Sequence, residues 1–324
     1  MTLSKLAQLA NVSVSVVSKA FSGRDDVSES MREHVFAVAK EHGCFEQFYH
    51  APYDKPVIAV IIPEAISEHY IKYVQLLKCG MEKNGYTMLL SISNFDEAMT
   101  RELIRYYNDH GNVDAIVTIG GMPNVRCKEG IVLIGMGDNG NPSASTIKID
   151  LSHGLESALL HLKEQGHRRI GCVVEPLVES KAKLMKSIME KHGMEISPEL
   201  FVCARGRFAE AGKEGVRKLL ALGDEKMPTA IFGGYGQITQ GIIEELEACG
   251  LSVPKDMSVI SMNEDSSLMH YSVEVSYISS MTERVCEEIL RILGERIGSK
   301  TRGNIEMITV PTQFIVGETT KNYK

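Results

Sequence analysis

Near the N-terminus, one short stretch combines small side chains with a single cation, at Val14, Ser15, Ser18 and Lys19. On one face of a helix, side chains this short would let the backbone approach the floor of a DNA major groove. There a valine packs on a thymine methyl, a serine donates or accepts a hydrogen bond, and a lysine reaches guanine O6/N7 or a phosphate. The Ser13 and Ser18 hydroxyls suit phosphate contacts. The alternative is that these are ordinary solvent-facing residues of a small helical bundle.

The secondary structure of this stretch can be interpreted in two ways. In "NVSVSVVSKAFSG" (11–23), apolar and polar residues alternate as in a half-buried strand until Val17 breaks the period. The preceding segment, "TLSKLAQLA", has the apolar spacing of a helix. If the following residues are also helical, Val16, Val17 and Ala20 share an inner face. The stretch is therefore predicted to be a helix with its polar residues outward.

A turn and a third helix would complete the bundle. Asn11 tolerates the left-handed conformation of a turn, and Ser13 and Ser28 are suited to N-capping the second and third helices. Glu29 stands in the first turn of the third helix, near the positive end of its dipole. The inner stripe of that helix is expected to comprise Met31, Val35, Val38, Ala39 and His42. Three short helices with a tight turn between the first two form a helix-turn-helix, here called the headpiece, residues 1–43.

The charge of the chain does not favour nucleic-acid binding as a whole. The 324 residues carry a net charge of −7, so a role on DNA must reside in a local patch. Within the headpiece, five basic residues are balanced by five acidic ones. One such headpiece would neutralise few phosphates, and two on a dimer would compensate.

From Val57 onward, apolar runs alternate with amphipathic stretches. Strands are expected at 57–62, 86–92, 113–120, 130–136, 145–149, 169–174, 200–204, 229–234 and 257–262. Helices are expected from after the first strand to Asn84, and at 96–110, 152–165, 180–192, 209–222, 236–249 and 281–297. Repeated βαβ units imply doubly wound parallel sheets. About 270 residues exceed one comfortable hydrophobic core, so two lobes with a ligand cleft between them are expected. We call this two-lobed region the core.

The cysteines and the termini indicate a cellular compartment. Seven widely spaced cysteines form no CxxC pair, which favours free thiols in a reducing cytosol over disulfides or a zinc site. No leader and no apolar run of about 18 residues is visible. The expectation is a cytoplasmic protein with no membrane contact, no metal and no cofactor. His42, Cys44 and His50 fit no standard zinc spacing.

Catalytic signatures are missing from the sequence. It contains no GxSxG, no P-loop lysine motif, no HExxH and no GxGxxG after a strand. The chain is therefore predicted not to be an enzyme, and an enzyme on this fold would have to show turnover with some metabolite.

The segment "TLSKLAQLANVSVSVVSKAFSGRDDVSESMREHV" resembles the headpiece of the lactose-repressor (LacI/GalR) family of bacterial transcription regulators. That family's pattern includes V-S-x-x-T-V-S-R-V and, later, V-S-x-x-T-R-x-x-V. The residues in register are Ala7, Ala10, Val12, Ser13, Val17, Ser18, Val27, Ser28, Arg32 and Val35. Farther on, "GHRRIG" (166–171) and "LSVPKDMSVISM" (251–262) resemble the family's core, so the likeness covers nearly the whole chain.

The resemblance implies an α/β protein with an N-terminal three-helix helix-turn-helix headpiece and a two-lobed periplasmic-binding-protein-like core. Residues 57–149 with about 280–310 would form the N-terminal lobe, and 150–279 with about 311–324 the C-terminal lobe. The implied partners are operator DNA, a small-molecule effector that is by family default a sugar or sugar derivative, and a second copy bound through the core. The residues expected to contact DNA are Thr2, Ser13, Val14, Ser15, Ser18, Lys19, Ser22 and Ser28.

Two of these positions matter most for base recognition. By the resemblance, Val14 and Ser15 occupy the specificity positions of the recognition helix. Lys19 replaces the family's arginine, which keeps the charge and loses the bidentate fork.

The linker departs from the family. Residues 44–56, "CFEQFYHAPYDKP", lack the family's tyrosine-proline-asparagine hinge and its intercalating leucine, and Pro52 would interrupt a helix. Insertion of a hinge helix into the minor groove is therefore not expected. Phe45, Phe48 and Tyr49 are expected to pack a dimer seam instead.

The effector cleft is also altered. Tyr235 and Gly236 stand where the family often has Asn-Asp, Lys183 and Met185 where it has an arginine motif, and Asn263 where it has the first of two aspartates. The residues expected at the cleft are Glu64, His69, Tyr70, Asp150, Lys183, Met185, Phe208, Tyr235 and Asn263. For each of them an ordinary loop or core role is the alternative.

Two functions remain open at this point. The first is a sequence-specific DNA-binding transcription regulator, a repressor by family default, modulated by an effector bound between the lobes. The second is a cytosolic ligand sensor whose headpiece has lost DNA binding, which the neutral headpiece and the altered hinge would suit. A periplasmic binding protein is disfavoured by the missing leader.

Overall fold

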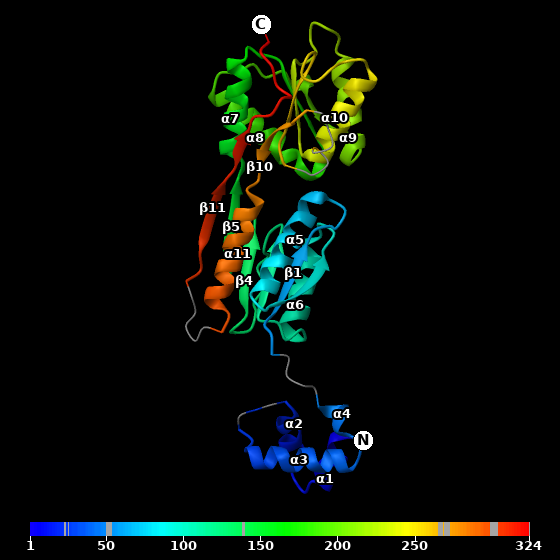
Figure 1. The fold of residues 1–324 in the computed structure, drawn as a ribbon, viewed down its shortest axis with the longest axis vertical. Coiled ribbons are helices and arrows are strands. Elements are labelled where there is room, and N and C mark those ends of the chain that lie inside the picture. The colour runs from blue at the N-terminus through cyan, green and yellow to red at the C-terminus, as the bar shows by residue number, and fades with distance from the viewer. Residues whose placement is uncertain are drawn as a thin grey trace. The chain divides into compact units, whose positions relative to one another are not determined.

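The computed structural model describes residues 1–22, 24, 26–49, 54–137, 140–264, 268, 273–298 and 304–323. Contacts divide the chain into two compact units, Met1–Lys55 and Pro56–Lys324. The first unit holds the headpiece and the second holds the core, and each is described by itself (Figure 1).

The headpiece contains the predicted three helices, α1 (Leu3–Leu9), α2 (Val14–Phe21) and α3 (Glu29–Glu41). The strand interpretation of the α2 segment was wrong. Val17 and Ala20 of α2 are buried against Leu6 and Val35, each at most 1% exposed, so the helical face set by Val17 is the one that packs.

The predicted inner stripe of α3 was only partly right. Val35 and Ala39 are buried and Val38 is half-buried, whereas Met31 and His42 are exposed. Met31 lies in the first turn of α3, and His42 is its C-cap. Only the central turns of this helix therefore contribute to the core of the bundle.

A fourth short helix, α4 (Phe45–Phe48), occupies the start of the predicted linker. The ring of Phe45 lies 6.0 Å from that of Phe21 and 5.2 Å from that of Phe36, and Phe48 lies 5.7 Å from Phe21. Tyr49 stacks on Phe45 at 4.5 Å. These rings pack on the three-helix bundle, because Phe21 and Phe36 offer them an apolar face. That they also line a dimer seam stays a prediction. Pro52 and the rest of 50–53 lie outside the described residues.

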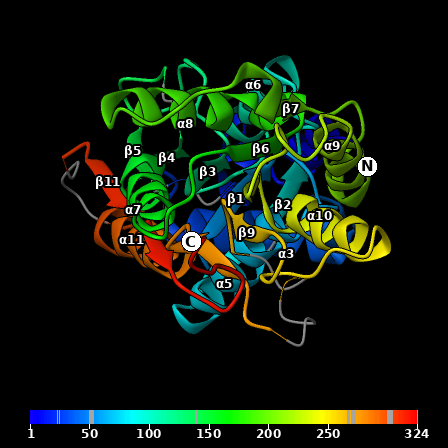
Figure 2. The ribbon, with the colours of Figure 1, turned by 90° about the horizontal axis from the view of Figure 1, so that it is seen from above.

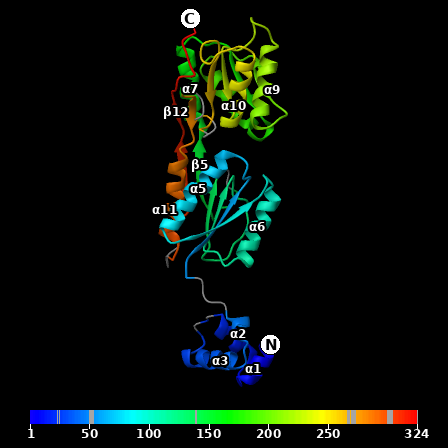
Figure 3. The ribbon, with the colours of Figure 1, turned by 45° about the vertical axis from the view of Figure 1, so that its right-hand side comes forward.

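The N-terminal lobe of the core is built on a six-stranded sheet in the order β11-β5-β4-β3-β1-β2, and every pairing in it is parallel. The strands are β1 (Val57–Ile62), β2 (Thr87–Ile92), β3 (Ala115–Ile119), β4 (Val132–Met136), β5 (Ser145–Asp150) and β11 (Met307–Pro311). Helices α5 (Glu68–Lys83) and α11 (Thr282–Arg296) cover one face, and α6 (Glu97–Asp109) covers the other (Figure 3).

The C-terminal lobe repeats this plan in the order β12-β10-β9-β8-β6-β7. Its strands are β6 (Ile170–Val174), β7 (Phe201–Cys203), β8 (Ala230–Gly233), β9 (Ser258–Ser261), β10 (Ser276–Ser279) and β12 (Gln313–Ile315), which pairs antiparallel with β10. Helices α7 (Leu151–Glu164) and α8 (Glu179–Lys191) cover one face, and α9 (Phe208–Leu220) and α10 (Gly236–Ala248) the other (Figure 2). Short 3₁₀ turns lie at Pro176–Val178 and Pro198–Leu200.

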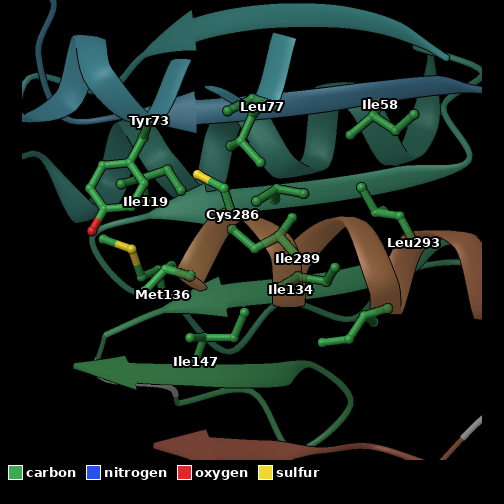
Figure 4. Packing of buried hydrophobic residues seen from close by; sticks show 14 of the residues in the cluster. Ile58, Tyr73, Leu77, Ile119, Ile134, Met136, Ile147, Cys286, Ile289 and Leu293 are labelled. Atoms are coloured by element: carbon green, nitrogen blue, oxygen red, sulfur yellow. The ribbon is translucent and has the colours of Figure 1, made fainter. Parts of the chain in front are cut away.

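The apolar runs of the sequence explain these sheets. Ile58, Ile134 and Ile147 lie under α5 and α11, whose Leu77 and Ile289 are fully buried (Figure 4). Strands covered on both faces have no need for polar alternation, so they are continuous apolar runs in the sequence. The doubly wound α/β prediction is confirmed, although β10, β11 and β12 were not predicted.

The chain passes between the lobes three times. It does so from β5 into α7 at Asp150–Leu151, from β10 into α11 after Ser279, and from β11 into β12 at Thr312. The backbone N–H and the hydroxyl of Thr312 donate to the carbonyl of Asp150 at 3.0 and 2.8 Å, which ties two of these crossings together.

Candidate functional sites

Side-chain hydroxyls cap the three headpiece helices, at Ser13 and Ser28 as predicted and at Thr2 in addition. Thr2, Ser13 and Ser28 each accept a hydrogen bond from the backbone N–H three residues on, at 3.2, 3.2 and 3.4 Å. Asn11, in the turn between α1 and α2, has a φ of 52°. A capping hydroxyl still carries its own proton, so all three remain able to donate to a phosphate.

The outward face of α2 carries the predicted base-reading residues. Val14 is 43% exposed, Ser15 and Ser18 are exposed, and Lys19 is half-buried. They line a hollow of about 700 Å³, whose wall consists of Leu3, Val14, Ser15, Ser18, Lys19, Ser22, Arg24 and Asp26. The same helix therefore anchors itself through one face and offers small side chains in a concave surface through the other.

Lys19 already has a partner within the headpiece. Its ammonium forms an ion pair with Asp26, at side-chain exposures of 44% and 55%. This hydrogen bond is the main reason why the pKa of Asp26 lies below its usual range. One of the two cations that line the hollow is thus held by a carboxylate, which would have to give way before Lys19 met a phosphate or a guanine.

In the core, one arginine joins two carboxylates that come from different lobes. Arg207, just before α9, places Nη1 and Nη2 each 3.0 Å from the Glu64 carboxylate, and its Nε 3.2 Å from Glu175 Oε2. Glu64 follows β1 and Glu175 follows β6. The side chains of Glu64 and Glu175 are 10% and 2% exposed, whereas that of Arg207 is 39% exposed. Both carboxylates raise the pKa of Arg207, Glu64 most.

Aromatic rings surround this ion cluster. The Arg207 guanidinium lies 4.5 Å from the ring centre of Phe208 and 6.0 Å from that of Phe95. The Tyr235 hydroxyl donates to Glu175 at 2.7 Å and accepts from the backbone N–H of Phe208 at 3.3 Å. Burial and the bond to Glu175 raise the pKa of Tyr235. Phe208 has a φ of 55°, a strained conformation for this residue, and it begins α9 there.

A histidine forms a second link between the lobes. The Asn263 side-chain amide donates to His69 Nδ1 at 2.8 Å, and the Ser280 hydroxyl bonds to Asn263 Oδ1. The His69 ring packs edge-on against Tyr70 and Tyr73, 5.1 and 5.2 Å between centres. Burial lowers the pKa of His69 to about 3, so the imidazole is neutral at physiological pH.

A third link lies beside it. Lys72 of α5 contacts Glu264 at 2.6 Å and Glu283 at 2.9 Å. Glu264 follows β9 of the C-terminal lobe, and Glu283 lies in α11. Together with the Arg207 and His69 contacts, this ion pair holds the two lobes against each other.

A cavity of about 750 Å³ lies in the N-terminal lobe. Its wall includes Ile61 and Pro63 at the end of β1 and Ile119 and Gly120 at the end of β3. The strand order reverses between β1 and β3, and such a switch point is the usual ligand site of a doubly wound sheet. Thr118 also lines the cavity, and its buried hydroxyl has no hydrogen-bond partner among the described residues.

Six of the nine residues expected at the effector cleft lie close together. Glu64, Phe208 and Tyr235 belong to the Arg207 cluster, while His69 and Asn263 bond to each other. Tyr70 joins the two groups, since its ring lies 5.1 Å from His69 and 5.9 Å from Phe95.

The other three lie elsewhere. Asp150 caps α7 by accepting from Ser152 N at 3.0 Å. The Lys183 side chain is 72% exposed and pairs with Glu179 one turn away. Met185 is fully buried in the C-terminal lobe. Lys183 and Met185 were expected at the cleft because they stand where the family has its arginine motif. Their positions on α8 instead turn Lys183 to solvent and Met185 into the core.

Four central residues were not predicted: Arg207, Glu175, Thr118 and Phe95. Glu175 follows the apolar run 169–174, and a charged residue at the carboxyl end of a buried strand is a usable signal. No such signal distinguished Arg207, because Arg205 stands two positions earlier in the same loop and the sequence pattern does not separate the two arginines.

Comparison with known families decides what this pair of units is. The family model described as "Bacterial regulatory proteins, lacI family" matches residues 2–44, and "Periplasmic binding protein-like domain" matches residues 159–320. The chain belongs to the lacI family. Its headpiece is that family's DNA-binding domain, so this lacI-family chain is a regulator of transcription.

Relatives share this organisation from end to end. The HTH-type transcriptional repressor CytR of Escherichia coli strain K12 is 24% identical over 93% of this chain and 92% of its own length. The structure of a transcriptional regulator CelR–cellobiose complex has a TM-score of 0.68, with 22% identity over 98% of this chain and 99% of that one. The lac repressor dimer bound to operator and the anti-inducer ONPF has a TM-score of 0.67, with 16% identity and 99% of each chain covered. These relatives are regulators rather than enzymes.

Two negative findings hold for the described part of this lacI-family chain. No helix there has the length and apolar character needed to cross a membrane. No cluster of three or more His, Cys, Asp or Glu side chains there could hold a metal ion.

Proposed function

We propose that this regulator recognises a specific operator through α2 and the helix caps, and represses the genes next to it. The concave outer face of α2 carries the proposal, because Val14 and Ser15 are exposed beside capping hydroxyls that can donate to phosphates. The repressor role is supported by the relative CytR, which is a repressor.

The proposed effector site comprises the cavity at the ends of β1 and β3 together with the Arg207 cluster. A small polar molecule bound there would contact the two lobes, since the cavity wall includes Leu177 after β6 as well as residues of the N-terminal lobe. The relative CelR is solved with cellobiose, which supports an effector of sugar-like size and polarity. Binding would change the contacts between the lobes and thereby the affinity for DNA.

A homodimer formed through the core completes the proposal. The headpiece carries little net charge, so one copy would neutralise few phosphates, while two copies on a two-fold operator would double the contacts. The lac repressor relative is a dimer on its operator.

Selection from a random duplex library with the full-length protein tests the proposal. A preferred sequence with two half-sites is the expected result. Val14→Ala/Ser15→Ala should change the preferred bases, while Glu33→Ala, at an exposed position of α3, should leave them unchanged. Recovery of no preferred sequence, with or without sugars, would favour the alternative of a ligand sensor without DNA function.

A further inference from the structure

The Arg207 cluster consists of Arg207, Glu64 and Glu175 with the rings around them. Its two carboxylates are buried, whereas its arginine is partly exposed. Glu64 and Glu175 are 10% and 2% exposed, but Arg207, which pairs with both, is 39% exposed. Buried carboxylates are costly without a counter-charge, so this place requires a cation. The group that supplies the cation is also the one nearest to solvent. Arg207 can therefore move out into water, where its guanidinium is hydrated, if another cation takes its place.

The surroundings of the guanidinium are those of a cation site. The rings of Phe208 and Phe95 lie 4.5 and 6.0 Å from it, and the Tyr70 ring packs on Phe95 at 5.9 Å. Aromatic faces attract cations through their quadrupole, most strongly where water is excluded. We call these three rings, Phe95, Phe208 and Tyr70, the cage. It would hold an ammonium or guanidinium group of a ligand equally well.

The cavity continues this cage, because Tyr70 and Phe95 belong to its wall. Asp96 and Glu97 also line it, and Glu97 pairs with Arg101 at 3.1 Å. Lys181 adds a cation nearby; it donates to Gly234 O at 2.7 Å, and burial lowers its pKa to about 8.

Among the described residues of cage and cavity, the four carboxylates of Glu64, Glu175, Asp96 and Glu97 thus face two cations, and only Arg101 remains if Arg207 withdraws. A second, independent observation points to a ligand in the same place. Thr118 is 2% exposed, and within the part of the chain that the structure describes its buried hydroxyl has no hydrogen-bond partner. An unpaired buried hydroxyl is costly, and a polar group of a ligand in the cavity would satisfy it.

We propose that the effector carries a protonated amine or guanidinium, as an amino sugar does, and that this group replaces Arg207 between Glu64 and Glu175. The uncharged polar part of the ligand occupies the cavity and bonds to Thr118. The inference rests on the proposed function, since it names the ligand class of the same site. An anionic ligand would be attracted by the Arg207 guanidinium but repelled by the two buried carboxylates.

Calorimetric titration of the full-length protein compares matched probes: D-glucosamine with D-glucose, D-galactosamine with D-galactose, and glucose 6-phosphate as the anion. We expect one amino sugar to bind at least tenfold more tightly than its neutral counterpart. Glu175→Gln should abolish that difference. Arg217→Ala, which removes a bidentate arginine–carboxylate pair at the surface of α9, should leave it unchanged.

A second measurement does not depend on the sugar chosen. Arg207→Ala opens the cage, so methylguanidinium should raise the melting temperature of this variant relative to wild type at the same concentration. The double variant Arg207→Ala/Glu175→Gln should lose much of that protection.

Three results would overturn the inference: a neutral sugar or glucose 6-phosphate binding as tightly as the amino sugars, an amino-sugar preference that survives Glu175→Gln, or no protection of Arg207→Ala by methylguanidinium. If a neutral sugar released the operator while amines had no effect, the inference would fail and the proposed function would stand.

Discussion

The headpiece and the core each contain a conspicuous ion pair, and the two differ in almost every physical respect. Lys19 and Asp26 are seven positions apart in the sequence and both are about half exposed. Arg207 joins Glu64 and Glu175, which are 143 and 32 positions away and almost completely buried. Solvent screens the first pair, so it can be exchanged for a phosphate at little cost. The second pair lies in a low-dielectric site, where only another cation can replace the arginine.

The largest effect is expected at the buried cluster. Arg207→Ala leaves two buried carboxylates facing each other and should lower the free energy of unfolding of the core by about 3 kcal/mol, the low end for a broken buried pair because the arginine is part-exposed. Urea unfolding followed by circular dichroism measures the loss. An Arg207→Ala variant as stable as the wild type would contradict the role assigned to Glu64 and Glu175.

The second effect comes from His69. The pKa of His69 is about 3 in the folded chain, below the usual 6.5. Between these two pH values the imidazole is therefore protonated in the unfolded chain and neutral in the folded chain. Stability is therefore fully present above pH 6.5 and is lost as pH falls, by about 1.4 kcal/mol per unit.

His69→Asn should flatten the decline in core stability between pH 7 and 5. The slope should not vanish, since burial also lowers the pKa of His161 and His167. His153→Asn, at an exposed position of α7, serves as the control. Thermal melts across this range decide the matter: an unchanged slope in His69→Asn would mean that the imidazole is not excluded from protonation.

A smaller effect is expected at the start of the recognition helix. Ser13→Ala removes the cap on Val16 N and should cost the headpiece about 1 kcal/mol. It should also weaken operator binding, because the same hydroxyl can donate to a phosphate. Ser13→Thr retains both functions and should restore most of each. Chemical-shift-resolved melting of the headpiece and fluorescence anisotropy on operator DNA measure the two effects separately.

The smallest effect on stability is expected at Asp26. Asp26→Asn breaks the ion pair with Lys19. Because this pair is exposed to solvent, the melting temperature should remain unchanged within error. DNA binding should nevertheless tighten at low salt, and the slope of log K against log salt should steepen by about 1, as one more phosphate is neutralised. Binding measured at several salt concentrations tests this, and an unchanged slope would show that Lys19 does not reach the DNA.

The same contrast explains what could be predicted from the sequence. In the headpiece, each functional feature is local: Ser13 caps a backbone N–H three residues on, and Val17 sets the buried face one helix turn from Val14. Patterns of this range are visible in a single sequence. The continuous apolar runs of β1, β3 and β4 likewise indicated buried parallel strands.

The cleft was predicted less completely because its chemistry is assembled from distant segments. Glu64 and Tyr235 were expected there from the family resemblance, but the arginine that joins Glu64 to Glu175 was not, since Arg205 and Arg207 are equivalent in sequence. The tail strands β11 and β12 are short and carry exposed residues such as Met307, which is 87% exposed, so no apolar run marked them.

The passage of the C-terminal tail from β11 into β12 has a consequence for biosynthesis. One continuous segment supplies an edge strand to each lobe, and beyond it Thr319 bonds to Val259 O and the Tyr323 N–H to Gln165 O. During synthesis the helix-turn-helix precedes the core, yet neither sheet of the core is complete until β11 and β12 have emerged. A chain that stopped before β11 would thus carry a finished DNA-reading unit on a regulatory core that is still open.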